Sequence, residues 1–353
     1  MSTRTKAALA AAIALWAFAG FLLYRDHRRM AQQQAATTAT RLLPELDPAR
    51  LQSITIQTAD AQTRLRLHDG RWTVAGQHGY YANGARVTDL VEAVGRLRAL
   101  QSFGVAPRDR GTLALNDPAA AKHGTGTRFV FRRHNDDIAA EFIVGAPART
   151  ADDGADSATD ARYLLLPDRG SVMLVPGELG AFSADWLDWL DWRFPQVPDV
   201  RRITRRRDVK RLWQVARTEA EAPLRPQAPL PPEHEPHPDR MARLGGMLNG
   251  ATFSAVGDPA RDADTWGFGD HHLDVQAADG LTWTFTLGRK TTRGRLPVTI
   301  RAAAADGNTA TAERAAGENE FYNGWVYLLP RATYAPMLYD RDDLLRPTPA
   351  RDE

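Results

Sequence analysis

Hydrophobic and polar positions alternate along much of the chain, in short runs that predict β-strands. Residues 51–57 and 63–67 place apolar side chains at every second position, which is typical of a hairpin with one buried face. Residues 129–131 and 138–145 repeat the pattern, as do 273–275 and 281–288, which Asp279-Gly280 joins as a strong hairpin dipeptide. This alternation favours sheets that are mainly antiparallel.

Two segments carry the spacing of an amphipathic helix instead. In the first, residues 86–100, Asn83 or Thr88 can cap a stripe formed by Val87, Leu90, Val91, Val94, Leu97 and Leu100. The second follows Asp239, stops at Asn249-Gly250, and contains Met241, Leu244, Met247 and Leu248. Strands and helices thus predict an α+β fold.

The chain also matches itself, which predicts an internal duplication. The shared landmarks, in one order, are an opening hairpin ending in Trp-x-Val-Ala (residues 72–75 and 213–216), a helix, an extended segment (102–105 and 253–256), a second hairpin, and a closing strand (Tyr163–Pro167 and Tyr327–Pro330). We therefore predict two tandem α+β repeats, residues 45–198 and 199–346, with a tail at 347–353. The repeats differ in loops: a proline-rich insertion at 222–239, and a stretch at 290–320, with an extra strand at 296–301, in place of the acidic loop 151–160.

The N-terminus predicts a membrane segment. Ala7–Tyr24 is 18 residues without a charge, flanked by Arg4 and Lys6 before it and by three arginines after it. At ~1.5 Å per residue such a helix spans about 27 Å, enough for a thin bilayer. We expect residues 1–29 to form a single transmembrane helix with its flanks, and the polar residues 30–44 to form a stalk.

A cleaved signal peptide is the competing interpretation, because Ala17-Phe18-Ala19 resembles a cleavage site. The apolar run continues past that site to Tyr24, which favours an uncleaved anchor. Similar charge on both flanks gives the positive-inside rule little weight, but a short N-terminal tail usually stays cytoplasmic. We therefore expect an inner (cytoplasmic) membrane protein whose bulk is extracytoplasmic, or periplasmic.

Composition removes several classes of function. The chain has 353 residues and no cysteine, which excludes disulfides, thiolate metal sites and cysteine nucleophiles. Its net charge of +2 argues against a general nucleic-acid binder. Phosphate-binding, dinucleotide-binding, GxSxG and HExxH motifs are all absent from the sequence. We expect no catalytic residue and no cofactor.

Two histidine clusters and one aspartate cluster contain residue types that bind metal ions, but none has the pattern of a known metal site. Glu233-His234-Glu235-Pro236-His237 and His271-His272 offer imidazole and carboxylate ligands, but the first lies in a proline-rich segment that we expect to be a mobile loop. The aspartates of the acidic loop 151–160 lack the calcium-loop pattern. Solvated loops are the simpler interpretation, and we expect no metal.

Two further clusters are candidates for binding a partner. Residues 201–211 carry seven positive charges, including Arg205, Arg206 and Arg207, which suits anionic lipid or a polyanionic glycan, or simply the solvated face of a hairpin. Tryptophan recurs every third residue at Trp186, Trp189 and Trp192, and aspartate precedes each one. On a helix the indoles would form one stripe, either an exposed docking surface or the packing between the two repeats.

Taken together, the chain resembles the membrane-anchored DUF4340 family, often found beside gliding-motility-type ABC transporter components. The matching features are the N-terminal anchor, Arg71-Trp72-Thr73-Val74, the helix 86–100, Leu115-Asn116-Asp117-Pro118, Ile143-Val144-Gly145 and Tyr163-Leu164-Leu165. The resemblance covers most of residues 45–345. The family typically has a Tyr-Gly-Leu-Asp-Pro-like segment before its central hairpin; the first repeat has Leu115-Asn116-Asp117-Pro118 there, whereas the second has Trp266-Gly267-Phe268-Gly269-Asp270 and lacks the proline.

The resemblance implies a non-catalytic, extracytoplasmic accessory or binding subunit of an ABC-type envelope transport system. Its partner would be the permease or an associated envelope protein, with Trp186, Trp189, Trp192, Arg205, Arg206 and Arg207 as candidate contact residues. One alternative is a cell-envelope enzyme that acts on polysaccharide or peptidoglycan through paired carboxylates. Another, a tethered lipoprotein-like receptor, is weakened by the absence of a lipobox cysteine.

Overall fold

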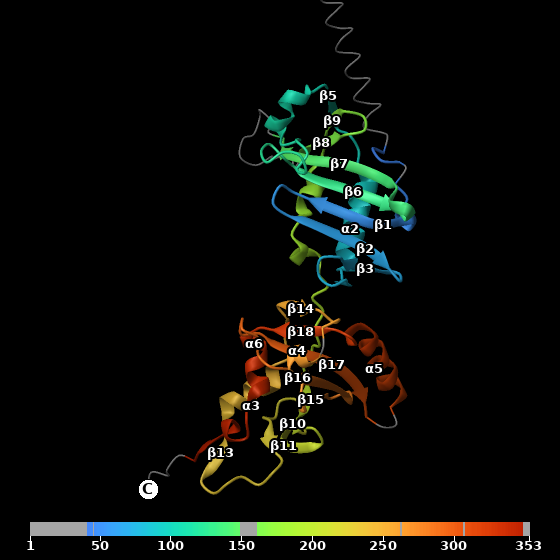
Figure 1. The fold of residues 1–353 in the computed structure, drawn as a ribbon. Helices are drawn as coiled ribbons and strands as arrows, with labels where there is room; N and C mark the ends of the chain where they lie inside the picture. Colours follow the sequence, from blue (N-terminus) through green and yellow to red (C-terminus); the bar gives the residue numbers. More distant parts are fainter. Residues whose placement is uncertain (1–40, 45, 149–160, 262, 306–307, 349–353) are drawn as a thin grey trace, which may run out of the picture. The chain divides into compact units, whose positions relative to one another are not determined.

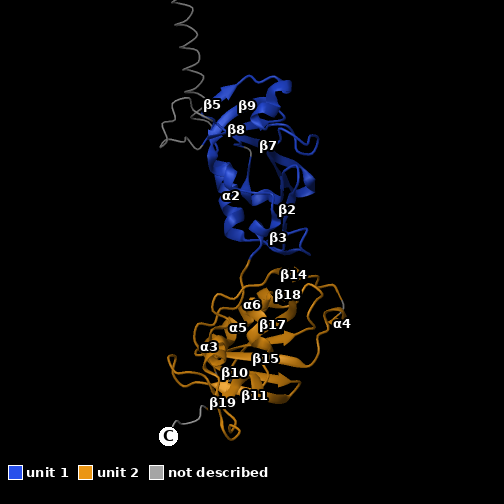
Figure 2. Ribbon diagram, turned by 90° about the vertical axis from the view of Figure 1, so that its left-hand side faces the viewer, with its two compact units in different colours: residues 1–191 blue, residues 192–353 orange. Residues whose placement is uncertain are grey.

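The computed structural model describes residues 41–44, 46–148, 161–261, 263–305 and 308–348. The chain divides into two compact units, residues 1–191 and 192–353 (Figure 2). Both are α+β with mostly antiparallel sheets, which confirms that part of the prediction. The apolar segment 7–24 and the acidic loop 151–160 lie outside the described residues. Among the residues that are described, no helix is long and apolar enough to span a membrane.

Unit 1 is built on a nine-stranded sheet in the order β4-β3-β2-β1-β6-β7-β8-β9-β5 (Figure 1). The strands are β1 (Leu51–Gln57), β2 (Gln62–His68), β3 (Arg71–Val74), β4 (Tyr80–Tyr81), β5 (Gln101–Phe103), β6 (Thr127–Arg133), β7 (Ile138–Pro147), β8 (Ala161–Leu166) and β9 (Ser171–Pro176). In the described part of unit 1, one α-helix, α2 (Gly84–Arg96), accompanies the short turns η1 (Pro48–Arg50), η2 (Pro107–Leu113), η3 (His134–Asp136), η4 (Gly177–Ala181) and η5 (Trp186–Trp189).

The predicted helix of unit 1 forms, but it is shorter than the pattern suggested. Asn83 caps α2, its side-chain oxygen accepting from the Arg86 N–H at 3.2 Å, and the helix ends at Arg96 rather than at residue 100. Val87, Leu90 and Val94 are buried with the apolar side chains of the sheet. The hydrophobic pattern predicted a longer helix because Leu97 is buried like the helix residues, although its backbone is already extended.

A second, smaller core lies on unit 1 and contains Leu115, Ile143, Leu165 and Val172. The backbone approaches very closely here: a Cβ on Gly145 would lie 2.2 Å from the Leu113 carbonyl oxygen. Only glycine fits at such a distance. The segment that carries Leu115 is therefore held tightly against β7.

Unit 2 contains an eight-stranded sheet in the order β12-β11-β10-β15-β16-β17-β18-β14, and a separate pair, β13 with β19. The strands are β10 (Val200–Arg207), β11 (Lys210–Ala216), β12 (Arg225–Pro226), β13 (His234–Pro236), β14 (Ala255–Gly257), β15 (His271–Ala277), β16 (Leu281–Leu287), β17 (Leu296–Ala304), β18 (Val326–Leu329) and β19 (Leu345–Pro347). The helices and turns are α3 (Pro238–Gly246), α4 (Ala263–Trp266), α5 (Thr309–Tyr322), α6 (Arg331–Tyr334), η6 (Ala335–Leu338) and η7 (Asp342–Leu344).

Seven neighbouring strands follow the same path in both units. The order β2-β1-β6-β7-β8-β9-β5 of unit 1 corresponds to β11-β10-β15-β16-β17-β18-β14 of unit 2. In each unit a helix, α2 or α3, immediately precedes the strand that ends this series. The two units therefore repeat one topology.

Some sequence landmarks nevertheless lie on strands that do not correspond. The Trp-x-Val-Ala motif is on β3 in unit 1 but on β11, the counterpart of β2, in unit 2. Tyr163 is on β8, whereas Tyr327 is on β18, the counterpart of β9. The predicted extra strand at 296–301 is β17, the counterpart of β8, so it is part of the repeat. These short motifs resemble each other without being equivalent, because similar apolar runs recur in several strands of each sheet.

Helix α5 is the true insertion in unit 2, between β17 and β18. Strand β17 has nine residues, but β18 pairs only with Leu296, Pro297 and Val298. Helix α5 packs on β17, and the Asn319 side chain both accepts from the Ala302 N–H and donates to the Ala302 carbonyl, each at 2.8 Å. The helix thus satisfies backbone groups that β18 is too short to reach.

Candidate functional site

The tryptophan-rich segment does not form the predicted helix. Only a single turn, η5, is present; the Asp185 carboxylate caps it by accepting from the Leu187 N–H at 3.0 Å. The chain then becomes extended, and the Asn83 N–H donates to the Trp189 carbonyl at 2.7 Å. A pairing with distant backbone therefore replaces the helical hydrogen bonds that the three-residue spacing suggested.

The three tryptophans are consequently separated. Trp189 is completely buried in unit 1, where its indole N–H donates to the Ser183 carbonyl at 2.9 Å and the Arg86 guanidinium lies 5.3 Å from its ring. Trp186 is half-buried. Trp192 belongs to unit 2, and its ring lies 4.9 Å from that of Phe253. The prediction of one tryptophan stripe is wrong.

The three candidate arginines at the end of β10 have three different environments. Arg205 points into the core of unit 2, is 7% exposed, and donates to the His271 Nδ1 at 3.3 Å and the His272 carbonyl at 3.5 Å. Arg206 and Arg207 form ion pairs instead, with Asp274 at 2.8 Å and Asp270 at 2.9 Å.

These contacts shift several pKa values. Burial lowers the pKa of the Arg205 guanidinium, while the negative charge of Asp340 opposes that shift. The hydrogen bond from Arg207 lowers the pKa of the exposed Asp270 carboxyl. Burial, with a smaller contribution from Arg206, lowers the pKa of His272, which favours its neutral form.

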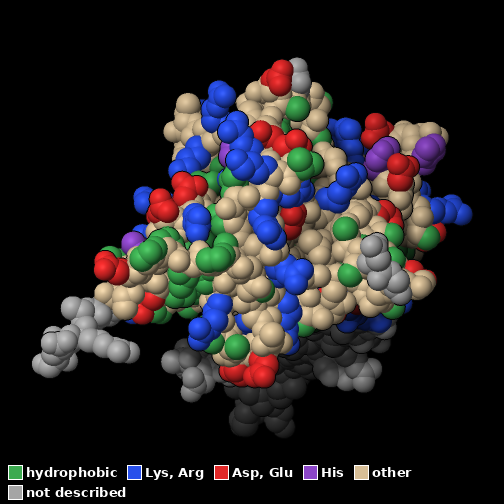
Figure 3. All heavy atoms as spheres, turned by 90° about the horizontal axis from the view of Figure 1, so that it is seen from below, with side chains coloured by type: hydrophobic (Ala, Val, Ile, Leu, Met, Phe, Trp, Pro, Cys, Tyr) green, Lys and Arg blue, Asp and Glu red, His purple; other side chains and the backbone are tan. Residues whose placement is uncertain are grey.

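Charge compensation extends beyond these residues. On the face of the molecule shown in Figure 3, Lys and Arg side chains lie interspersed with Asp and Glu side chains. Within the basic run, Arg206 and Arg207 already have carboxylate partners. The run therefore offers much less net positive charge to a polyanion than its sequence suggests.

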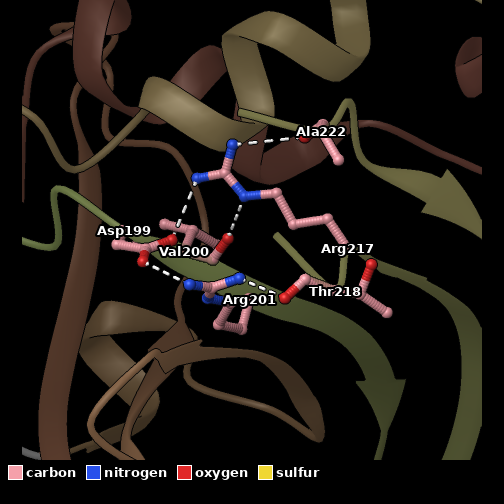
Figure 4. Close-up of polar contacts among 6 residues, drawn as sticks. All are labelled: Asp199, Val200, Arg201, Arg217, Thr218 and Ala222. Atoms are coloured by element: carbon pink, nitrogen blue, oxygen red, sulfur yellow. Dashed lines mark hydrogen bonds and ion pairs between the residues drawn. The ribbon is translucent and has the colours of Figure 1, made fainter. Parts of the chain in front are cut away.

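Another arginine in this run has a structural role, which the sequence did not reveal. Asp199, just before β10, accepts from Arg201 at 2.8 Å and from Arg217 at 3.4 Å (Figure 4). Arg217 also donates to the Val200 carbonyl at 2.7 Å and the Ala222 carbonyl at 3.4 Å. This group of residues, the Asp199 clasp, holds the start of β10 against the end of β11.

Both histidine clusters include residues that lie on strands. His234 and Glu235 lie in β13, which pairs with β19, so the expected mobile loop at 233–237 is wrong. His271 and His272 are neighbours on β15 and so point to opposite faces of its sheet. Among the described residues, no three His, Asp or Glu side chains form a group able to hold a metal ion.

A cavity in unit 2 that sequence reasoning missed has the composition of a binding site. It measures about 840 Å³ and lies between the end of α3 and the segment from Pro330 to Tyr339. Two arginines line it, Arg243 from the last turn of α3 and Arg331 from the first position of α6. Asn249 and Thr252 add an amide and a hydroxyl, and its lining contains no acidic side chain.

Unit 1 has a cavity of a different character beside α2. It measures about 560 Å³ and is lined mainly by apolar groups, among them Leu43, Trp72 and Val91. Its Arg96 forms an ion pair with Glu92, which also lines it. Of the four cavities characterised in the described part of the chain, none has two carboxylates in its lining.

No protein-family model, curated protein or solved structure shows a significant match to this chain. The family resemblance and the function that it implies therefore stay predictions.

Proposed function

We propose that this chain is a membrane-anchored, extracytoplasmic binding subunit, without catalytic activity of its own, of an ABC-type envelope transport system. Ala7–Tyr24 would hold it in the inner membrane, and both units would lie outside. The apolar segment and the resemblance to the DUF4340 family support this location and partner. The proposed role is recognition: rigid domains held beside a permease.

The observation that carries the binding role is the lining of the unit 2 cavity. Arginine, amide and hydroxyl groups recognise a ligand by hydrogen bonding, whereas general acid–base catalysis most often relies on a His, Glu or Asp side chain near the reacting atoms. The cavity holds the first kind of group and no carboxylate. The alternative of a glycan-cleaving enzyme calls for two facing carboxylates, and none of the four cavities supplies them.

Among the candidate partner contacts, only side chains that are exposed or half-buried can reach a partner. Arg207 is exposed and Trp186 is half-buried, whereas Trp189 and Arg205 are buried. A partner bearing acidic groups could compete with Asp270 for Arg207. We therefore propose Trp186 and Arg207 as the contact residues to test first.

Crosslinking and pull-down of the tagged chain from native membranes tests the partner. We expect a permease or another transporter component to be recovered, and recovery to fall for Trp186→Ala and Arg207→Ala while thermal unfolding changes little. Arg50→Ala, an exposed arginine in unit 1, is the matched control. Recovery of no transporter component would refute the proposed partnership.

The absence of cysteine allows a clean test of location. Ser2→Cys and Val209→Cys would each introduce one thiol, and Val209 is 89% exposed. In spheroplasts, a membrane-impermeant maleimide should label the Val209→Cys variant at once and the Ser2→Cys variant only after permeabilisation. The reverse order of labelling would place both units in the cytoplasm and exclude the proposed function.

A further inference from the structure

The unit 2 cavity contains two positive charges that the protein does not neutralise. Arg243 and Arg331 both line it and are exposed, and neither side chain makes an ion pair or hydrogen bond with another described residue. Many other arginines of the described chain do form such pairs, including Arg206, Arg207 and Arg240. Two arginines without a carboxylate partner in the lining of one cavity produce a local positive potential.

The walls of this cavity are fixed by hydrogen bonds on both sides. The Thr333 hydroxyl donates to the Thr252 carbonyl at 3.0 Å, which ties α6 to the loop after α3. The Gln196 side chain holds that loop from the other side, accepting from the Gly250 N–H at 2.7 Å and donating to the Ala251 carbonyl at 3.0 Å. The site is thus formed before any ligand arrives, which lowers the entropic cost of binding.

An aromatic side chain, Tyr339, forms a third wall of the cavity. Tyr339 lines the cavity, and the Arg240 guanidinium lies 5.5 Å from its ring centroid. The carbonyl of Tyr339 accepts from the Trp213 indole N–H at 2.9 Å. Tyr339 therefore offers a flat surface of fixed position for an uncharged part of a ligand to pack against.

Unit 1 shows that the topology does not require this arrangement. The last turn of α2 also carries an arginine, Arg96, but Glu92 neutralises it. Arg331 directly follows Pro330, the proline after β18; at the corresponding position, directly after Pro176 of β9, unit 1 has the buried Gly177. The two unpaired cations are therefore specific to unit 2 and are not a by-product of the fold.

We propose that this cavity binds a small solute through an oxyanion, a phosphate or carboxylate group held by Arg243 and Arg331. Guanidinium groups match the geometry of both anions and form charge-assisted hydrogen bonds with them. A volume of about 840 Å³ lies within the range of ligand sites and leaves room beside the anion for an uncharged body, next to Tyr339 and Asn249.

Isothermal titration calorimetry of the full chain in detergent micelles tests this site, with inorganic phosphate and citrate as separate probes. At least one probe should bind, and its affinity should fall as salt is added. Arg243→Gln and Arg331→Gln should each weaken binding by about tenfold or more, and the double variant should abolish it. Phosphate binding without citrate binding would identify the phosphate group as the preferred anion, and the reverse would identify the carboxylate.

Arg96→Gln, in unit 1, is the matched control and should bind like the unaltered chain. Circular dichroism on each variant verifies folding, which substitution of exposed arginines should preserve. Absence of binding heat with both probes, or equal affinity in the double variant, would overturn the proposal. The measurement needs no transporter, so its outcome is separate from that of the pull-down.

Discussion

The two units share a strand order but join one pair of neighbouring strands in different ways. In unit 1, β8 and β9 pair along six residues each, and a four-residue turn, 167–170, connects them. In unit 2, the corresponding strands β17 and β18 pair at three positions, and α5 lies between them. The comparison shows that this sheet tolerates a short strand when an inserted helix satisfies the backbone left unpaired.

The units also differ in how they treat their charges. Around the unit 1 cavity, Arg96 is neutralised by Glu92, and the Arg128 side chain on its sheet pairs with Glu141 at 2.7 Å. In unit 2, ion pairs fix the strands while Arg243 and Arg331 stay unpaired at the cavity. The arginine at the end of α2 is therefore paired in unit 1, whereas the one at the end of α3 in unit 2 is left for a ligand.

Removing the Trp189 side chain should give the largest effect and should be confined to unit 1. Trp189→Ala deletes a fully buried indole, which costs about 3–5 kcal/mol of unfolding free energy. Hydrogen exchange with mass spectrometry should show faster exchange in peptides of unit 1 and unchanged exchange in unit 2. Equal acceleration in both units would show that they do not fold as separate bodies. The half-buried Trp186→Ala should cost much less.

Breaking the Asp199 clasp should destabilise unit 2 by about 1–3 kcal/mol in total, because two arginines lose their carboxylate and water replaces part of each interaction at these partly exposed side chains. Urea denaturation of Asp199→Ala measures the loss. Asp168→Ala, an exposed aspartate of unit 1 beside Arg169, is the control and should be neutral. A neutral Asp199→Ala would mean that the backbone alone holds the start of β10.

Asn319→Ala tests what the inserted helix does. It removes both hydrogen bonds to Ala302, so we expect a loss of about 1–2 kcal/mol and faster amide exchange at β17. Glu318→Ala, next to it on α5, should leave both unchanged. Protection of the Ala302 amide in the Asn319→Ala variant would show that another group covers this part of β17.

The smallest effect should be a pH dependence specific to unit 2. Because burial lowers the pKa of His272, the unfolded chain binds a proton more readily than the folded chain. The free energy of unfolding should therefore decrease as pH falls below about 6.5, the ordinary value for histidine. Thermal unfolding across this range should show a weaker dependence in His272→Gln, whereas the exposed control His68→Gln should match the unaltered chain.

Local patterns predicted the parts of this fold that local physics determines. Alternation predicted the strands, Asp279-Gly280 predicted its hairpin, and the Val87–Val94 stripe predicted α2. The tryptophan spacing failed because it suits one turn as well as a helix, and the choice was made by backbone near Tyr81, about a hundred residues away in sequence. The unit 2 cavity was not predictable, since Arg243 and Arg331 meet only through the tertiary fold.

The outermost strands of both sheets are short, and this has a consequence for the behaviour of the chain in a crowded compartment. Strands β4 and β12 have two residues each, and β5 and β14 have three. A strand recruits another chain by offering it a row of free N–H and carbonyl groups, and two or three residues offer very few. Although 17 strands in two sheets might suggest a tendency to aggregate, the main sheets present almost no template for it. Short edge strands therefore limit the pairing of the two main sheets with other chains.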